Sequence, residues 1–503
     1  MYNPFEFDLV VRNGIIVTAS DEFACDIGIK DGVIVVLGQS LPASPDCELI
    51  DAEGGYITPG GIDSHVHINQ LGSLGARSSD TWTTGTRGAI SGGTTTVIAF
   101  AVQAKGKKIM PAVEEYYQTA KGACHCDYSF HSIITDPTEN LVKNEIPKMV
   151  EFGITSVKIY MTYPLLKLSD KEILDILCGA RQAGVTTMVH AENADMIDWM
   201  TNNLLERGLV EPWHHGTSRP PLIESEATNR AIALAEVIDA PMLIVHVSSK
   251  EATAHIRKAQ TRGLPIYAET CPHYALLTAD KMHAPGFEGA KCVCAPPVRS
   301  DPLDKESIWD GLGNGTFTVF SSDHAPYNYY DAEGKQRGMT NNPTKNPRGN
   351  FKNTPNGIPG ICTRTPLLWS EGVLKGRISR QKFVELNSTN AAKLYGMYPK
   401  KGTIQPGSDA DLVIWRTSKS RRPYTITQDK LHHAADYTPF EGMEIEDWPR
   451  TVLLRGKIAY DGETNEVLAP AGSGEFIKRG FSTLPGPRGK SDAWINDWNP
   501  HEM

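Results

Sequence analysis

The middle of this chain alternates strand-like and helix-like segments, and this alternation constrains the fold more than any other feature of the sequence. Eight short runs are β-branched or uniformly apolar, which is typical of strands buried on both faces of a parallel sheet. They occupy residues 60–68, 94–102, 128–135, 156–163, 186–193, 241–249, 265–271 and 317–325. A chain with this pattern is expected to form an α/β fold.

Amphipathic stretches separate many of these runs, for example at residues 170–184 and 249–263. Both stretches end in a glycine just before the next run, as a helix with a left-handed C-terminal cap does. Eight strands with interleaved helices predict a (β/α)8 TIM-like barrel. An open doubly wound sheet is the alternative. No Gly-x-Gly-x-x-Gly motif follows an early strand, however, so the dinucleotide-binding version of that fold loses support.

The two ends of the chain have a different pattern, in which short strands are joined by tight turns. Residues 7–17 contain an Asn-Gly pair between apolar runs, and residues 25–38 contain an Asp-Gly pair, so we expect a hairpin in each. Residues 407–415 and 451–468 return to this pattern near the C-terminus. We therefore predict a small β-sandwich domain built from both termini.

These patterns predict how the chain is divided into domains. The predicted parts are the N-terminal half of the sandwich (1–57), the (β/α)8 barrel (58–398), the C-terminal half of the sandwich (399–480) and a tail (481–503). The tail contains Trp494 and Trp498 on an otherwise polar arm, so we expect it to pack on a neighbouring subunit. Residues 327–359 form a long segment without periodicity, which is typical of a functional loop.

Composition excludes several classes of protein. The 503 residues include 50 Lys and Arg against 59 Asp and Glu, and a net charge of −9 disfavours general binding to nucleic acid or anionic membrane. No apolar run is long enough to span a membrane, and the N-terminus lacks the regions of a secretory signal. The nine cysteines are scattered and form no Cys-x-x-Cys pair, which favours a reducing, cytoplasmic location.

The strongest chemical signal is the pair His65 and His67, which lies on a predicted strand. Residues i and i+2 of a strand point to the same side, so both imidazoles can reach one metal ion. Further polar groups lie at or near the C-terminal ends of other predicted strands, where barrel enzymes assemble their sites. They are Lys158, His190, His246 and Asp323. Packing alone does not explain six such groups on five strands.

In this order and context, these residues resemble the binuclear-metal amidohydrolase superfamily. More narrowly, the chain is similar to the dihydropyrimidinase and hydantoinase family of cyclic amidohydrolases. The segments that carry the resemblance include GGIDSHVH, GGTTTVIAF, VKIYMTY, VHAEN, RPPLIESEATNRA, IVHVSS, ETCPHYALLT, APPVR, SSDHAP, PNGIPG and STNAAKLYGMYPKKGTIQPGSDADLVIW. They span nearly the whole chain except the last thirty or so residues.

The resemblance implies a site with two divalent metal ions, most suitably zinc. One ion would be held by His65, His67 and Asp323, and the other by His190 and His246. Lys158 would be carboxylated on its ε-nitrogen and bridge both ions, because a carbamate made from CO2 offers two oxygens and a negative charge where an ammonium offers none.

The resemblance also implies how a substrate is held and opened. Asp323 would carry a proton from the attacking water to the leaving ring nitrogen, and the Tyr163 hydroxyl would stabilise the oxyanion. Main-chain groups of Ala295 and Asn356 would grip the ring amide. The family has Ser at the position of Ala295, but a main-chain contact survives that difference. The expected substrate is a small cyclic ureide or imide, and the expected assembly is a homotetramer.

Other functions remain open at this point. Dihydroorotases typically have Arg two residues after the second histidine, where this chain has Asn69, and allantoinases usually continue from the same Asn with Glu-Pro-Gly rather than Gln70-Leu71-Gly72. An allantoinase or a cyclic imidase is the alternative enzyme. Leu71 and Leu74 are expected to form an apolar wall for a ring substituent. The alternative outside enzymes is a scaffold similar to the collapsin-response mediator proteins, which have lost metal ligands that this chain keeps.

Overall fold

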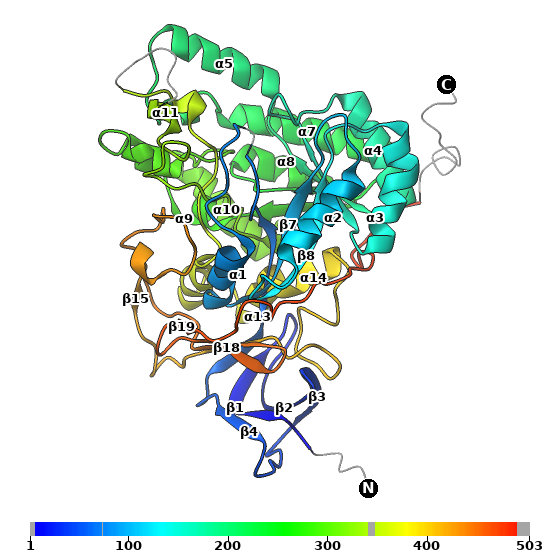
Figure 1. Cartoon of the computed structure of the whole chain (residues 1–503), viewed down its shortest axis with the longest axis vertical. Coiled ribbons are helices and arrows are strands. Elements are labelled where there is room, and N and C mark those ends of the chain that lie inside the picture. The colour runs from blue at the N-terminus through cyan, green and yellow to red at the C-terminus, as the bar shows by residue number, and fades with distance from the viewer. Residues whose placement is uncertain (1–5, 73, 341–347, 490–503) are drawn as a thin grey trace.

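The chain forms a parallel barrel with a second sheet beside it (Figure 1). The structure is a computed structural model that describes residues 6–72, 74–340 and 348–489. The eight barrel strands follow one another in sequence order, and the first and last approach each other through a parallel bridge between Val66 and His324. The His67 N–H donates to the His324 carbonyl at 2.7 Å. The sheet is therefore nearly closed, and the predicted (β/α)8 class is confirmed.

All eight runs predicted from the sequence contribute strands to this barrel. The strands are β6 (Gly61–Val66), β7 (Thr94–Val102), β8 (Asp127–Ile133), β9 (Ser156–Tyr160), β10 (Thr186–His190), β11 (Met242–Ile244), β12 (Ile266–Thr270) and β13 (Val319–Phe320). Every residue of β8, β9 and β10 is buried. Burial on both faces is typical of strands in a parallel barrel, whose outer side is covered by helices.

Helices surround the barrel on its outer side (Figure 1). The main ones are α1 (Trp82–Ser91), α2 (Ile109–Ala120), α3 (Ile146–Phe152), α4 (Asp170–Gln182), α5 (Ala194–Glu206), α7 (Pro221–Ile238), α8 (Lys250–Thr261) and α10 (Pro302–Asn314). Shorter helices are α6 (His214–Thr217), α9 (Pro272–Leu276), α11 (Arg337–Thr340), α12 (Arg364–Leu367), α13 (Arg380–Val384) and α14 (Asn390–Leu394).

Helices α4 and α8 begin and end where the sequence predicts. The Ser169 and Ser249 hydroxyls accept hydrogen bonds from backbone N–H groups of the first turns, which otherwise lack partners. Gly184 and Gly263 follow the two helices with φ of 69° and 74°, the left-handed conformation that stops a helix. The polar cap and the glycine therefore mark both ends of each helix.

The second sheet has nine strands and takes them from both ends of the chain. They are β1 (Leu9–Val17), β2 (Glu22–Lys30), β3 (Val33–Gly38), β4 (Glu48–Asp51), β5 (Tyr56–Pro59), β14 (Leu412–Trp415), β17 (Thr451–Leu454), β18 (Lys457–Asp461) and β19 (Glu466–Val467). Its first strands lie at the lower end of Figure 1, below the barrel. Its core contains Val11, Ile27 and Leu453, so strands from both ends share one apolar interior.

One of the predicted hairpins is wrong. Asn13 and Gly14 do not turn the chain, because β1 continues through them and stays paired with β2 on both sides of a bulge. Asn13 takes a φ of 56°, and a Cβ on Gly14 would lie 2.2 Å from Ile57 Cδ1. The Asn-Gly pair therefore serves a bulge and a close approach between strands. The Asp31-Gly32 turn between β2 and β3 forms as predicted.

The predicted tail is only partly within the described residues. Residues 490–503, with Trp494 and Trp498, lie outside them, so the oligomerisation arm stays a prediction, as do the domain boundaries. Before them, Arg488 forms an ion pair with Asp239 at 3.0 Å.

In the described part of the chain, no helix combines the length and apolar character needed to cross a membrane. All nine cysteines are free thiols.

A buried cluster of charges joins the barrel to the second sheet. The Lys401 ammonium lies 2.5 Å from Asp127 at the start of β8, 2.8 Å from Asp409 and 2.6 Å from Asp411, which precedes β14. Arg455 also pairs with Asp127. Three carboxylates this close together repel one another unless a cation lies among them. Lys401 is therefore the cation that makes this junction possible.

We predict that Lys401→Met lowers the free energy of unfolding by about 3–5 kcal/mol, because it leaves buried carboxylates without their partner. Chemical denaturation followed by fluorescence measures this change. Lys400→Met is the matched control, since Lys400 pairs with Asp409 from a side chain that is 59% exposed, and we expect a loss under about 1 kcal/mol. Equal losses in the two variants would contradict the role of Lys401.

Candidate functional site

A cavity of about 640 Å³ opens at the carboxyl end of the barrel strands. The structure brings nearly all of the predicted site residues to its wall. Those that line it are His65, His67, Tyr163, His190, His246, Ala295, Asp323 and Asn356. Lys158 is in the middle of β9 and is fully buried in the barrel. Residues that are far apart in the sequence thus meet because parallel strands end at the same rim.

His65, His67 and Asp323 converge on one point. The Asp323 Oδ1 lies 3.2 Å from His65 Nε2 and 3.4 Å from His67 Nε2. The two imidazoles reach it because they are two residues apart on the extended chain at the end of β6. Asp323 follows β13 with a φ of 46°, a conformation that is strained for a residue with a side chain.

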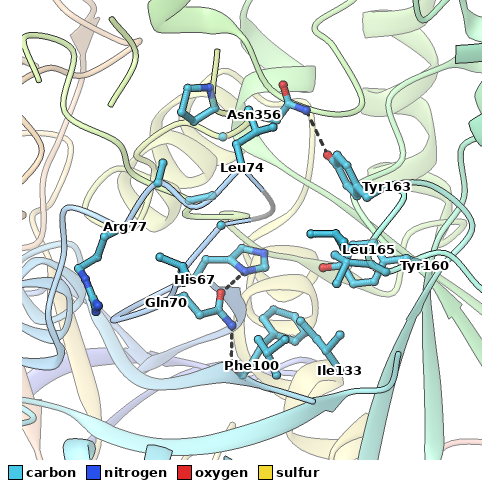
Figure 2. Close-up of a pocket in the computed structure, with 18 of the residues that line it drawn as sticks. His67, Gln70, Leu74, Arg77, Phe100, Ile133, Tyr160, Tyr163, Leu165 and Asn356 are labelled. Carbon is cyan, nitrogen blue, oxygen red and sulfur yellow. Dashed lines mark hydrogen bonds between the residues drawn. The ribbon is translucent and has the colours of Figure 1, made fainter. Parts of the chain in front are cut away.

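Neighbouring side chains orient both imidazoles. The Nδ1 of His65 lies 2.6 Å from Glu269 Oε1, and the Nδ1 of His67 lies 2.7 Å from Gln70 Oε1. Gln70 is itself held by a hydrogen bond to the Phe100 carbonyl, as Figure 2 shows. With Nδ1 engaged, each ring turns its Nε2 toward Asp323, which is the arrangement that outer-shell partners impose on metal-binding histidines.

His190 and His246 form the other half of the site. Their ring centroids are 4.4 Å apart. Glu192 Oε2 accepts from His190 Nε2 at 2.7 Å and from the Arg219 guanidinium at 2.5 Å, so His190 keeps its Nδ1 for another partner. The Nδ1 of His246 has no hydrogen-bond partner among the described residues. Each ring therefore offers one nitrogen that the protein leaves unused.

The Lys158 amine is buried without a partner. Its Nζ makes no hydrogen bond within the described part of the chain, and it lies 5.3 Å from the Tyr160 ring centroid and 5.6 Å from that of Phe100. It does not reach solvent, as a snorkelling lysine would. Burial lowers the pKa of Lys158 to about 8. A buried amine that loses its proton more readily than an ordinary lysine and has no hydrogen-bond partner suits covalent or metal chemistry better than an ion pair.

Burial also sets the charge of the other groups. It lowers the pKa of His65 and of His246 well below the usual range, so both rings are neutral, which is the form that binds a metal. Burial raises the pKa of Glu269 to about 8. For Glu192 burial acts in the same direction, but Arg219 and His190 together bring its pKa down to about 2.

This donor set fits divalent cations. Imidazole nitrogens and carboxylate oxygens are the ligands that zinc prefers in catalytic sites. Ligand atoms of His65, His67 and Asp323 lie within 4.8 Å of one another, and His190 and His246 line the same cavity. An unpartnered polar atom in a closed interior is costly unless something binds it. These residues could therefore hold metal.

Tyr163, Ala295 and Asn356 line the cavity beyond the histidines. The Tyr163 hydroxyl accepts a hydrogen bond from Asn356 Nδ2 at 3.4 Å (Figure 2). Burial raises the pKa of Tyr163, so its phenol stays protonated and can donate. The main-chain N–H groups of Ala295 and Asn356 have no partner among the residues that the structure describes. They are available to a molecule in the cavity.

The outer part of the cavity is formed by the loop that follows β6. Leu71 and Leu74 line it, as predicted, and so does Arg77, which pairs with Leu71 across a narrow turn of the chain. Figure 2 shows Arg77 on the opposite side of the cavity from Tyr163 and Asn356. The loop therefore gives the cavity an apolar wall, and its cation, Arg77, lies away from Tyr163 and Asn356.

The sequence prediction missed four residues that bind or orient groups of this site, namely Gln70, Glu192, Arg219 and Glu269. Glu269 could have been found, because it is the one charged residue in the apolar run 265–271. Glu192 follows His190 by two residues and so lies on the same side of the chain. For Gln70 and Arg219, no local pattern marks a function, since their partners come from other elements.

The comparisons with known proteins agree with this geometry. Residues 56–459 match the Amidohydrolase family. The chain is 41% identical to a D-hydantoinase of Ralstonia pickettii, over 94% of this chain and 99% of that protein. It is similar to the solved structure of a dihydropyrimidinase from Brevibacillus agri, with a TM-score of 0.89 and 38% identity over 95% and 99% of the two chains. An L-hydantoinase (dihydropyrimidinase) from Arthrobacter aurescens has a TM-score of 0.82 at 27% identity, over 94% and 100%.

We predict that Glu192→Gln weakens metal binding about 10- to 100-fold, because the uncharged amide holds His190 and Arg219 less firmly. Titration of the purified protein with zinc in the presence of a competing chelator measures the change. Glu226→Gln is the control, since Glu226 is on α7 and binds Asn193 and Arg230 outside the cavity. An unchanged zinc affinity in Glu192→Gln would remove its role as a support of His190.

Proposed function

The chain belongs to the amidohydrolase family, among its hydantoinases and dihydropyrimidinases, and on this premise we propose that it hydrolyses the ring amide of hydantoins and dihydropyrimidines. The products would be N-carbamoyl amino acids. The observation that carries the proposal is the convergence of His65, His67 and Asp323 in a cavity whose barrel also buries the unpartnered amine of Lys158. The protein is then a cyclic amidohydrolase.

The proposed metal ligands follow from the donor atoms that the protein leaves unused. His65, His67 and Asp323 would hold one divalent ion, and His190 and His246 a second. Lys158 would carry a carbamate, whose two oxygens can bridge both ions and whose negative charge offsets theirs. Zinc suits this set of imidazole and carboxylate ligands best. When bound, the ions would supply Lewis-acid polarisation of the ring carbonyl and of water.

The side chains around the cavity would perform the remaining steps. The Asp323 carboxylate would accept the proton of the attacking water and pass it to the leaving ring nitrogen. The protonated Tyr163 hydroxyl would donate a hydrogen bond to the oxyanion that forms at the ring carbonyl. The free N–H groups of Ala295 and Asn356 would hold the ring amide in place. Leu71 and Leu74 would exclude water around a ring substituent.

The setting of the enzyme is also a proposal. Nine free thiols support a reducing, cytoplasmic location, since disulfides form readily elsewhere. The resemblance to hydantoinases supports a homotetramer. A scaffold of the collapsin-response-mediator type is disfavoured, because all six groups proposed as ligands are retained here.

We predict that Lys158→Ala loses its bound metal and lowers kcat/KM for hydantoin by more than about a thousandfold, because the bridging carbamate disappears. Elemental analysis and a ring-opening assay measure the two effects. Short carboxylic acids added to the variant should restore part of the rate by replacing the bridge.

Lys167→Ala is the matched control for this experiment. Lys167 follows the same strand but is exposed and pairs with Asp195 outside the site. Its loss should leave metal content and rate unchanged. Wild-type metal content together with a wild-type rate in Lys158→Ala would refute the bridging role.

The substrate panel that tests the proposed function comprises dihydrouracil, hydantoin, 5-substituted hydantoins, allantoin, cyclic imides and dihydroorotate. We predict that kcat/KM for dihydroorotate is about 100-fold below that for hydantoin or dihydrouracil, because the loop that follows His67 has no arginine at position 69 to pair with a ring carboxylate in a partly desolvated site. Asn69 stands where an arginine would be needed, and Arg77 lies across the cavity from Tyr163 (Figure 2). A preference for dihydroorotate or allantoin would overturn the assignment.

A further inference from the structure

Two buried side chains that no step of the proposed reaction uses lie directly behind the main-chain groups proposed to hold the ring. Lys335 comes from the long segment 327–359 and is fully buried. Its Nζ donates to the carbonyls of Val293 and Pro355, each at 2.7 Å. His215, on α6, lies with its Nε2 2.8 Å from the Cys294 carbonyl.

Two of these three carbonyls share a peptide group with an N–H that is proposed to hold the ring amide. The carbonyl of Pro355 belongs to the same peptide group as the N–H of Asn356, and the carbonyl of Cys294 to the same group as the N–H of Ala295. A carbonyl that accepts a hydrogen bond withdraws charge through the conjugated peptide bond, so the N–H of that group becomes a stronger donor. Each proposed substrate donor therefore has a buried donor behind it.

Lys335 is an unusual residue for a purely structural link. No carboxylate pairs with its ammonium among the described residues; its neighbours include the two carbonyls, the thiols of Cys292 and Cys294, and the Tyr327 ring, 6.0 Å away. Burying an ammonium without an anion is costly. Burial lowers the pKa of Lys335 to about 7, yet the neutral amine also has two N–H donors, so both contacts persist in either form.

The same contacts fix the two segments relative to each other. The Val293 carbonyl accepts from Lys335 Nζ and also from the Gly357 N–H at 3.0 Å. The segment with Ala295 and the segment with Asn356 are thus tied together through Val293, on both sides of Asn356. The spacing of the two free N–H groups depends on this tie.

We propose that Lys335 and His215 are positioning residues, which strengthen and aim the N–H groups of Asn356 and Ala295 toward the ring amide of the substrate. The inference rests on the proposed function and adds to it the source of the binding strength. Neither residue would touch the substrate. Both act through a peptide group, so their loss weakens the grip on the ring and leaves the ligands of the metal ions unchanged.

The test compares the metal-loaded wild-type protein with Lys335→Met and His215→Met, using hydantoin as substrate. We expect KM to rise about five- to tenfold in each variant, with kcat within about twofold, because the interaction lost is made equally before and during the reaction. Metal content should match the wild type. Lys352→Met is the matched control, since the ammonium of this exposed lysine of the same segment binds Asn202 rather than the two carbonyls, and the KM of this variant should not change.

A second pair of variants separates this role from simple support of the fold. His215→Gln keeps an N–H donor and should recover most of the KM that His215→Met loses, whereas a purely structural role would follow the melting temperature instead. If Lys335→Met does not fold, the two His215 variants still show whether a donor behind the peptide group sets KM. Wild-type KM in folded, metal-loaded His215→Met, or a loss confined to kcat, would overturn the inference. Absence of ring opening by the wild-type protein would instead overturn the proposed function, and the inference with it.

Discussion

The burial of many ionisable groups at one end of a closed parallel barrel is the constraint on which the rest of this structure depends. The carboxyl ends of β6, β9, β10 and β13 meet there, and they bring histidines, a lysine and a carboxylate out of water together. Removing such groups from solvent costs free energy unless each finds a partner. Much of the structure around the site consists of residues that bind these buried groups and so offset the cost of their desolvation.

Those partners come from elements other than the ones that carry the site. Glu269 on β12 orients His65, and Glu192 binds both His190 and Arg219. Behind the cavity wall, Lys335 and His215 bind carbonyls of segments that follow β12 and β13. Among the buried atoms that still lack a hydrogen-bond partner in the described part of the chain are Lys158 Nζ and His246 Nδ1. The unsatisfied atoms in the cavity thus mark where chemistry is expected.

Buried charges are also paired within the protein at the other end of the barrel. The cluster around Lys401 joins β8 to the approach of β14, so charges buried at this junction are neutralised within the protein. Here every carboxylate has its cation in the chain, and the cluster needs no ligand. Three carboxylates close together therefore do not indicate a metal site when a lysine already lies among them. The unpartnered atoms in the cavity differ from this cluster, because no group of the chain binds them.

The sequence by itself determined the barrel and most of the site residues, because periodicity, strand-end position and residue type are local properties. The candidate site residues His65, His67, Lys158, His190, His246 and Asp323 stand out in this way, and so do the glycines that follow α4 and α8. Tertiary structure decided what depends on distant partners. The Asn13-Gly14 pair reads as a turn but is a bulge, because β1 stays paired with β2 beyond it. Gln70, Arg219, His215 and Lys335 gain their roles only from atoms that the fold brings to them, and no pattern within a short stretch of chain records such contacts.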